Sequence, residues 1–123
     1  MATGVVFIHG MWSQRGVWDR WLPAFAERGY VCDAVTLPAH HAGAHDAELA
    51  GVGFEDCVDA AARACARFAH PILIGHSMGG LIAQKLATRL TPRAVVLLNS
   101  AAPRAVFPLR SANVRGLSRH FVR

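Results

Sequence analysis

A serine stands between glycines in residues 75–80, which read Gly-His-Ser-Met-Gly-Gly. An apolar run precedes this segment and a helical pattern follows it, so the residues predict a strand, a tight turn and a helix. In a G-x-S-x-G turn the serine hydroxyl projects from a strained bend that only glycines leave room for. Ser77 is therefore the candidate nucleophile, at the N-terminus of a helix whose dipole favours developing negative charge.

A second signal lies in residues 5–12, Val-Val-Phe-Ile-His-Gly-Met-Trp, which predict a strand ending in a His-Gly loop. Acyl transfer needs two N–H donors for a developing oxyanion, and the backbone N–H groups of Met11 and Met78 are the candidates. His9 is expected to be a hydrogen-bonding residue at the strand end rather than an acid or base. Trp12 is expected to line a substrate pocket or to pack in the core.

The residues around Ser77 are predicted to support the turn. Gly79 and Gly80 are expected to let the helix pack close to the strand. His76 is expected to point away from Ser77, so it is a poor candidate for the general base. The full set of predicted supporting residues is His9, Gly10, Gly75, His76, Gly79 and Gly80.

Strands and helices alternate along the sequence. Strand-like runs occupy residues 4–8, 30–36, 71–75 and 93–99, and helical patterns occupy residues 17–28, 54–68 and 81–90. This alternation predicts an α/β fold with a parallel sheet and helices on both faces. Right-handed crossovers give about four strands in the order 2-1-3-4. The order reverses between strands one and three, where such folds bind ligands, so the His-Gly loop and the Ser77 turn should meet in one crevice.

Length and composition set the outer bounds. The 123 residues fit at most one domain, and 53% apolar with 17% charged residues favours a globular protein. No apolar run is long enough to span a bilayer, and the start has no basic region typical of a signal peptide, so we expect a cytoplasmic protein without a membrane span. Three cysteines without a C-x-x-C pattern suggest free thiols.

The net charge of +5 arises from the last 24 residues, which contain five arginines and no acidic residue. Three of these arginines, at positions 115, 119 and 123, fall on one side of a short helix predicted after Pro103. Without interleaved aromatic residues or a binding motif, the stripe is interpreted as a solvated helix face. We expect no nucleic-acid partner.

Two other kinds of site fit the sequence poorly. A phosphate-binding loop would need Gly-Lys followed by Ser or Thr, and Lys85 comes a full turn too late. The cluster His40, His41, His45 and Asp46 matches no standard metal-ligand spacing and lies in a loop rich in Ala and Gly. No metal and no cofactor are therefore expected.

Together these motifs resemble the α/β-hydrolase superfamily, specifically small esterase and lysophospholipase-like members with a His-Gly-x-Trp oxyanion loop. The similarity extends to Leu-Pro-Ala-His at residues 37–40 and to residues 99–103, which look like loops after the family's fourth and sixth strands. It implies an incomplete α/β-hydrolase fold, with the N-terminal half of the core in residues 1–103 and the start of a cap-like basic segment in residues 104–123. It also implies serine-dependent hydrolysis of small carboxylic esters or thioesters.

The resemblance further implies a triad in the chain order serine, acid, histidine, with the last two after the seventh and eighth strands. No acidic residue follows Asp59, and His120 is the one histidine after the turn at residues 75–80, which we call the elbow. Without a base a serine hydroxyl is a poor nucleophile, so weak or absent turnover is expected. The alternative is a truncated, non-catalytic half-domain that needs a partner or its missing C-terminal half. Cofactor-free peroxidases and hydroxynitrile lyases use a similar elbow serine and stay open.

The fourth predicted strand carries a structural consequence of its own. Its residues Ala94 to Leu98 are apolar, and no further strand-like run follows to cover them. An apolar strand at a sheet edge offers unpaired backbone groups to other chains. We therefore expect self-association through this edge.

Overall fold

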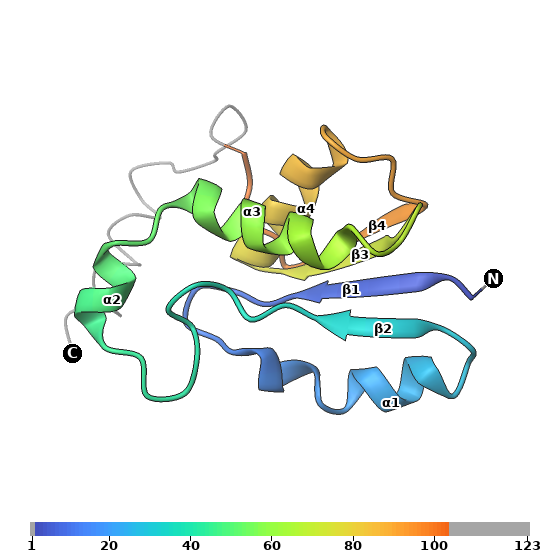
Figure 1. Ribbon diagram of the computed structural model, residues 1–123, viewed down its shortest axis with the longest axis horizontal. Helices are drawn as coiled ribbons and strands as arrows, with labels where there is room; N and C mark the ends of the chain where they lie inside the picture. Colours follow the sequence, from blue (N-terminus) through green and yellow to red (C-terminus); the bar gives the residue numbers. More distant parts are fainter. Residues whose placement is uncertain (1, 104–123) are drawn as a thin grey trace.

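The computed structural model describes residues 2–103. Four parallel strands form one sheet in the order β2-β1-β3-β4, and these are β1 (Gly4–Ile8), β2 (Val31–Ala34), β3 (Ile72–His76) and β4 (Ala94–Leu98) (Figure 1). The predicted parallel α/β sheet and its strand order are confirmed. Parallel strands covered on both faces are apolar throughout, which is why the apolar runs located them.

Helices cover both faces of the sheet. The helix α1 (Trp21–Ala26) lies on one face, and α3 (Phe54–Cys65) and α4 (Met78–Ala87) lie on the other (Figure 1). Alternate residues of β1 point to opposite faces. Val5 and Phe7 accordingly pack with Trp18 on the α1 side, whereas Val6 and Ile8 join the larger core beneath α3 and α4.

The predicted helix over residues 17–28 is wrong in its extent. The structure has a 3-10 helix η1 (Arg15–Trp18) and then α1, whose third residue is Pro23. Proline fits the first turn of a helix, where the N–H has no intrahelical acceptor, but in the interior its ring clashes with the carbonyl four residues earlier. A helix running through from residue 17 would have placed Pro23 in that interior.

Two further differences concern short elements. A five-residue helix, α2 (Asp46–Ala50), stands where a loop was predicted, and the helix predicted over residues 54–68 ends at Cys65. The short helix predicted after Pro103 lies outside the described residues. The proposed boundary between residues 103 and 104 therefore stays a prediction.

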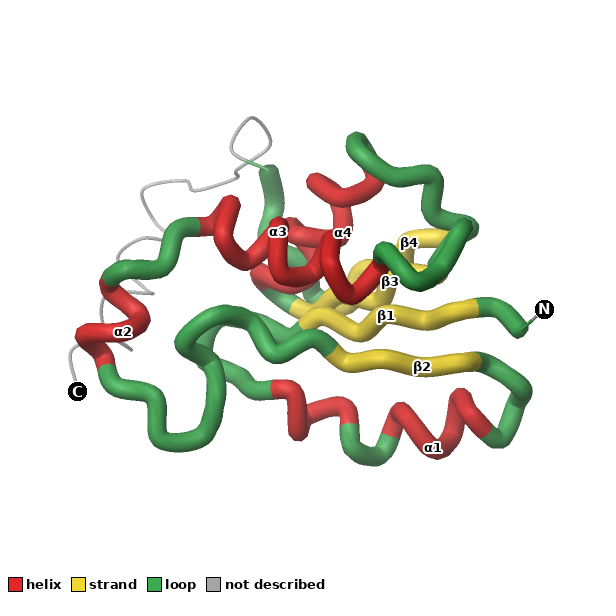
Figure 2. Tube along the Cα trace, in the orientation of Figure 1, coloured by secondary structure: helices red, strands yellow, loops and turns green. Residues whose placement is uncertain are grey.

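Strand pairing brings the two sequence motifs to one edge of the sheet. Ile8, the last residue of β1, pairs with Gly75 near the end of β3. The loop after β1 and the turn after β3 consequently leave the sheet side by side (Figure 2). In the described part of the chain, no helix is both long and apolar enough to cross a membrane.

Candidate active site

Ser77 has a strained backbone that its neighbours hold in place. It stands between β3 and α4 with φ 54° and ψ −120°, a conformation that residues with a side chain rarely adopt. The Ser77 N–H donates to Leu98 O at 3.1 Å, and the Ala101 N–H donates to Ser77 O at 2.9 Å. Strain of this kind persists only where the surroundings over-determine the backbone, and it is concentrated at functional sites.

At three positions of the elbow, a different close neighbour leaves room only for glycine. A Cβ atom on Gly75 would collide with the backbone of Gly79, and one on Gly79 would collide with the carbonyl oxygens that end β1. One on Gly80 would collide with Ser100, in the loop after β4. Gly79 thus lets α4 approach a strand, whereas the space left by Gly80 is taken by that loop.

The loop after β1 lies directly against Ser77. A Cβ atom built on Gly10 would lie 3.1 Å from the Ser77 Cβ and 3.6 Å from its Oγ. Met11 follows Gly10, and Met78 is the first residue of α4, where an N–H has no intrahelical acceptor. The two candidate oxyanion donors therefore belong to segments that flank the serine on either side, and their role stays a prediction.

His9 is fully buried and joins the loops after β1 and β2. Its Nδ1 lies 2.8 Å from Gly10 O, and the Leu37 N–H donates to its Nε2 at 3.3 Å. Both ring nitrogens are thus used when Nδ1 carries the proton. Burial lowers the pKa of His9, the Gly10 carbonyl acts in the opposite direction, and His40 lowers it further. The surroundings favour a neutral ring that shapes the loop before Met11.

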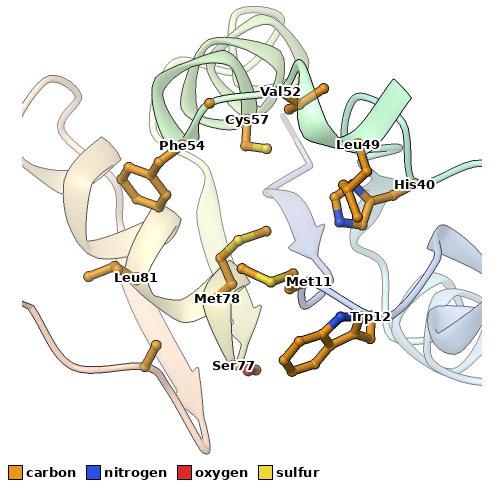
Figure 3. Close-up of a pocket in the computed structure, with 12 residues that line it drawn as sticks. Met11, Trp12, His40, Leu49, Val52, Phe54, Cys57, Ser77, Met78 and Leu81 are labelled. Carbon is orange, nitrogen blue, oxygen red and sulfur yellow. The ribbon is translucent and has the colours of Figure 1, made fainter. Parts of the chain in front are cut away.

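A cavity of about 760 Å³ opens beside Ser77 (Figure 3). The loop after β1, the segment around α2, and the first turns of α3 and α4 supply most of its walls. The lining residues are Met11, Trp12, His40, Leu49, Val52, Gly53, Phe54, Cys57, Ser77, Met78, Leu81 and Ala101. None of them is Lys, Arg, Asp or Glu, so the cavity suits an uncharged, apolar group.

Two tryptophans that follow β1 have different places. Trp12 lines the cavity with 77% of its surface exposed, whereas Trp18 is buried against Phe7 at a ring-centroid distance of 5.1 Å. Trp18 is thus a core residue. His76 is exposed and is not among the residues that line the cavity.

The histidines near α2 contact different groups and do not converge on one point. His40 is buried, with its Nδ1 2.7 Å from Pro38 O, while its Nε2 has no hydrogen-bond partner in the described structure. His41 lies 3.6 Å from the Glu48 carboxylate. Within residues 2–103, no three His, Cys, Asp or Glu side chains are grouped closely enough to hold a metal ion.

Several cavity residues were not singled out from the sequence. Phe54 and Cys57 fall within the helix predicted over residues 54–68, and Leu49 belongs to α2, which was not predicted. Burial raises the pKa of the Cys57 thiol and Asp56 raises it further, so this thiol is neutral at physiological pH. Helical spacing finds a buried face, but it does not tell a core residue from one that faces a cavity.

Comparison with known proteins settles the family. Residues 5–123 match the model of the Alpha/beta hydrolase family. The chain belongs to this family. Among curated proteins, none matches the sequence significantly. The α/β-hydrolase assignment agrees with the observed sheet order and with the elbow at Ser77.

Solved structures with the same fold include several α/β hydrolases. A pyrethroid hydrolase from Sphingobium faniae JZ-2 is 29% identical with a TM-score of 0.69, over 81% of this chain and 40% of that one. An extracellular alpha/beta-hydrolase from a Paenibacillus species has a TM-score of 0.73 at 23% identity, over 96% and 51%. A thioesterase domain from the curacin biosynthetic pathway has a TM-score of 0.73 at 21% identity, over 96% and 43%. The chain thus spans about half or less of the solved chains it matches.

Proposed function

We propose that this chain carries the nucleophile and oxyanion donors of a serine hydrolase that acts on carboxylic esters or thioesters. The observation that carries the proposal is the strained Ser77, which stands between the loop of Gly10 and the N-terminus of α4 and lines an apolar cavity. The pyrethroid hydrolase and the thioesterase domain among the similar structures agree with this reaction class.

The proposed reaction follows from the groups that surround Ser77. Its Oγ attacks the substrate carbonyl carbon and gives up its proton to a general base. The resulting oxyanion accepts hydrogen bonds from the N–H groups of Met11 and Met78. Collapse of this intermediate expels the alcohol or thiol with a proton, and water then hydrolyses the acyl-serine.

The cavity beside Ser77 supports substrates with an uncharged apolar group. Its side chains are mainly aliphatic, aromatic and thioether groups such as Leu49, Phe54 and Met78. A charged substituent there would lose its hydration without gaining a counter-charge. We therefore propose an ester or thioester with a bulky apolar portion that binds between α3 and the loop after β1.

The proposal assigns no general base within residues 2–103. His40 lines the cavity together with Ser77, but its Nε2 makes no hydrogen bond to the Ser77 hydroxyl or to any other group within residues 2–103, and the family pattern places the acid and histidine after later strands. The chain spans 40% of the pyrethroid hydrolase and 51% of the Paenibacillus protein. We propose that segments equivalent to the rest of those proteins supply the base.

A fluorophosphonate probe tests the nucleophile directly. Because the oxyanion donors are present and the base is not, we expect the probe to label the purified chain slowly at Ser77, and Ser77→Ala to abolish the labelling. Labelling that survives Ser77→Ala, or no labelling of the unmodified chain, would contradict an activated Ser77. A His40→Gln variant serves as the comparison for the base, and we expect it to be labelled as fast as the unmodified chain.

The competing function is a non-catalytic half-domain that acts through a partner. It is supported by two observations: none of residues 60–123 is acidic, and no general base is assigned within residues 2–103. A nitrophenyl ester series with acyl groups of increasing length separates the two proposals. Hydrolysis by the 123-residue chain that is lost in Ser77→Ala contradicts the non-catalytic function, whereas equal rates for the two proteins support it.

A further inference from the structure

We propose that Gln84 is a positioning residue for Ser77, acting through the loop after β4. The proposal rests on the serine-hydrolase function above. Gln84 lies on α4 about two turns after the elbow and is partly buried. It does not line the cavity, so its effect on the reaction passes through hydrogen bonds to the loop rather than through contact with substrate.

The chain of contacts begins at the Gln84 side-chain amide. Its Nε2 donates to Ser100 Oγ at 3.1 Å, and the Ser100 hydroxyl donates in turn to Ala101 O at 2.8 Å. Because the Gln84 N–H takes up a lone pair of the Ser100 oxygen, the Ser100 hydroxyl proton is directed toward the Ala101 carbonyl. Hydrogen bonds in series polarise one another, so the two bonds stabilise one loop conformation together.

The same loop holds both peptide groups of the nucleophile. Leu98 O accepts the Ser77 N–H, and the Ala101 N–H donates to Ser77 O. Between these two anchors, Asn99 has φ 43°, so the chain turns sharply from one to the other. The strained backbone of Ser77 is thus fixed by residues that Gln84 and Ser100 hold in place.

Steric contacts make this arrangement specific. Ser100 fits against α4 only because Gly80 has no side chain, since a Cβ there would collide with the Ser100 side chain. Ala101 also lines the cavity. The loop therefore connects a wall of the proposed substrate site to the backbone of the nucleophile. Gln84 holds this loop against α4 through its hydrogen bond to Ser100.

Replacement of the amide donor gives the first test. Gln84→Met keeps the length of the side chain and removes the N–H, and we expect the fluorophosphonate labelling rate to fall about tenfold, equivalent to about 1.4 kcal/mol. Thr88→Val is the matched control, because it removes a 2.7 Å side-chain bond to Lys85 O on the same helix without touching the loop. Equal labelling rates for Gln84→Met and Thr88→Val would overturn the proposal.

Gln84→Glu gives a readout that a merely structural role would not change. An ionised carboxylate would draw the Ser100 hydroxyl proton away from Ala101 O, whereas a protonated carboxyl donates as the amide does. We expect the labelling rate of Gln84→Glu, divided by that of the unmodified chain, to rise as the pH falls from 7 to 4, through the ordinary glutamate pKa of about 4.3. A ratio that does not change with pH contradicts the proposal.

Hydrogen exchange separates this inference from the proposed function. The Ser77 N–H donates to Leu98 O and the Ala101 N–H donates to Ser77 O, and we call these two hydrogen bonds the clamp on Ser77. Exchange of both amides should quicken in Gln84→Met and stay unchanged in Thr88→Val. If the unmodified chain is not labelled, the proposed function fails, but the exchange rates still decide the role of Gln84. Unchanged protection of both amides in Gln84→Met would refute that role.

Discussion

Gly10 and Ser77 are in contact across the ends of β1 and β3, because a Cβ atom on Gly10 would lie only 3.1 Å from the Ser77 Cβ. The pairing of Ile8 with Gly75 sets this approach. Strand pairing therefore holds the loop that carries one candidate oxyanion donor against Ser77. Its distance from Ser77 depends on the absence of a single methyl group.

Gly10→Ala should slow the reaction of Ser77 more than it lowers stability. The added methyl group displaces the loop or the serine by a few tenths of an ångström, and misplaced donors lose transition-state stabilisation. We expect the fluorophosphonate labelling rate to fall about tenfold, a change of about 1.4 kcal/mol. Gly16→Ala is the control, because its Cβ would meet only Asp19 Oδ2, at 3.5 Å. Equal labelling of both variants would show that the contact is unimportant.

The strain at Ser77 predicts different effects of two substitutions on stability. Ser77→Gly relieves a backbone with φ 54°, which glycine adopts readily, whereas Ser77→Ala keeps the strain. We expect Ser77→Gly to have a free energy of unfolding about 1 kcal/mol above that of Ser77→Ala. Urea denaturation of both variants measures the difference. A Ser77→Gly protein less stable than Ser77→Ala would argue against strain at this position.

His9 predicts a loss of stability in acid. Its pKa in the folded protein lies below the ordinary value of 6.5, chiefly because the ring is buried, so the unfolded chain binds the proton more tightly. The contribution of His9 to stability is complete above pH 6.5 and is lost as the pH falls below that value toward the folded pKa. The slope in that range approaches about 1.4 kcal/mol per pH unit for one proton.

Urea midpoints between pH 5 and pH 8 test this expectation. His9→Gln keeps an acceptor for the Leu37 N–H but does not titrate, so its profile should be flatter below pH 6.5 than that of the unmodified chain. His70→Gln is the control, because His70 is an exposed histidine far from this loop in the sequence. Parallel profiles for the unmodified chain and His9→Gln would remove His9 as the cause.

The outer strand β4 predicts association between copies of the chain. It lies at the edge of the described sheet, and Val96 and Leu97 are 40% and 44% exposed. A lysine on an edge strand opposes pairing with another chain. Leu97→Lys should therefore lower the sedimentation coefficient at high protein concentration. Val31→Lys places the same charge at a similarly exposed site on the opposite edge and should leave it unchanged; the reverse result would assign the association to β2.

Sequence patterns located the sheet and the elbow because both have strong local signals. Apart from Asp33 in β2 and His76 at the end of β3, the four strands contain only apolar residues and glycine, and the glycines around Ser77 mark a turn that nothing larger can make. The meeting of Gly10 with Ser77 followed from the handedness of crossovers, which fixes the strand order. Topology thus predicted a contact between residues that are far apart in the chain.

The features that escaped prediction depend on contacts that have no local pattern. The helix α2 is only five residues long, too short to show a period of 3.6. The partnership of Gln84 with Ser100 exists only once β4 pairs with β3. Neither residue differs, in sequence alone, from an ordinary polar residue on a helix or in a loop.

The clamp on Ser77 also sets an order in time. Its two anchors, at Leu98 and Ala101, come later in the chain than the residue that they hold. During synthesis, which proceeds from the N-terminus, the elbow has no partner for either peptide group until those residues have emerged and β4 has joined the sheet. Ser77, the proposed nucleophile, is therefore translated early but acquires its folded backbone conformation among the last steps of building this sheet.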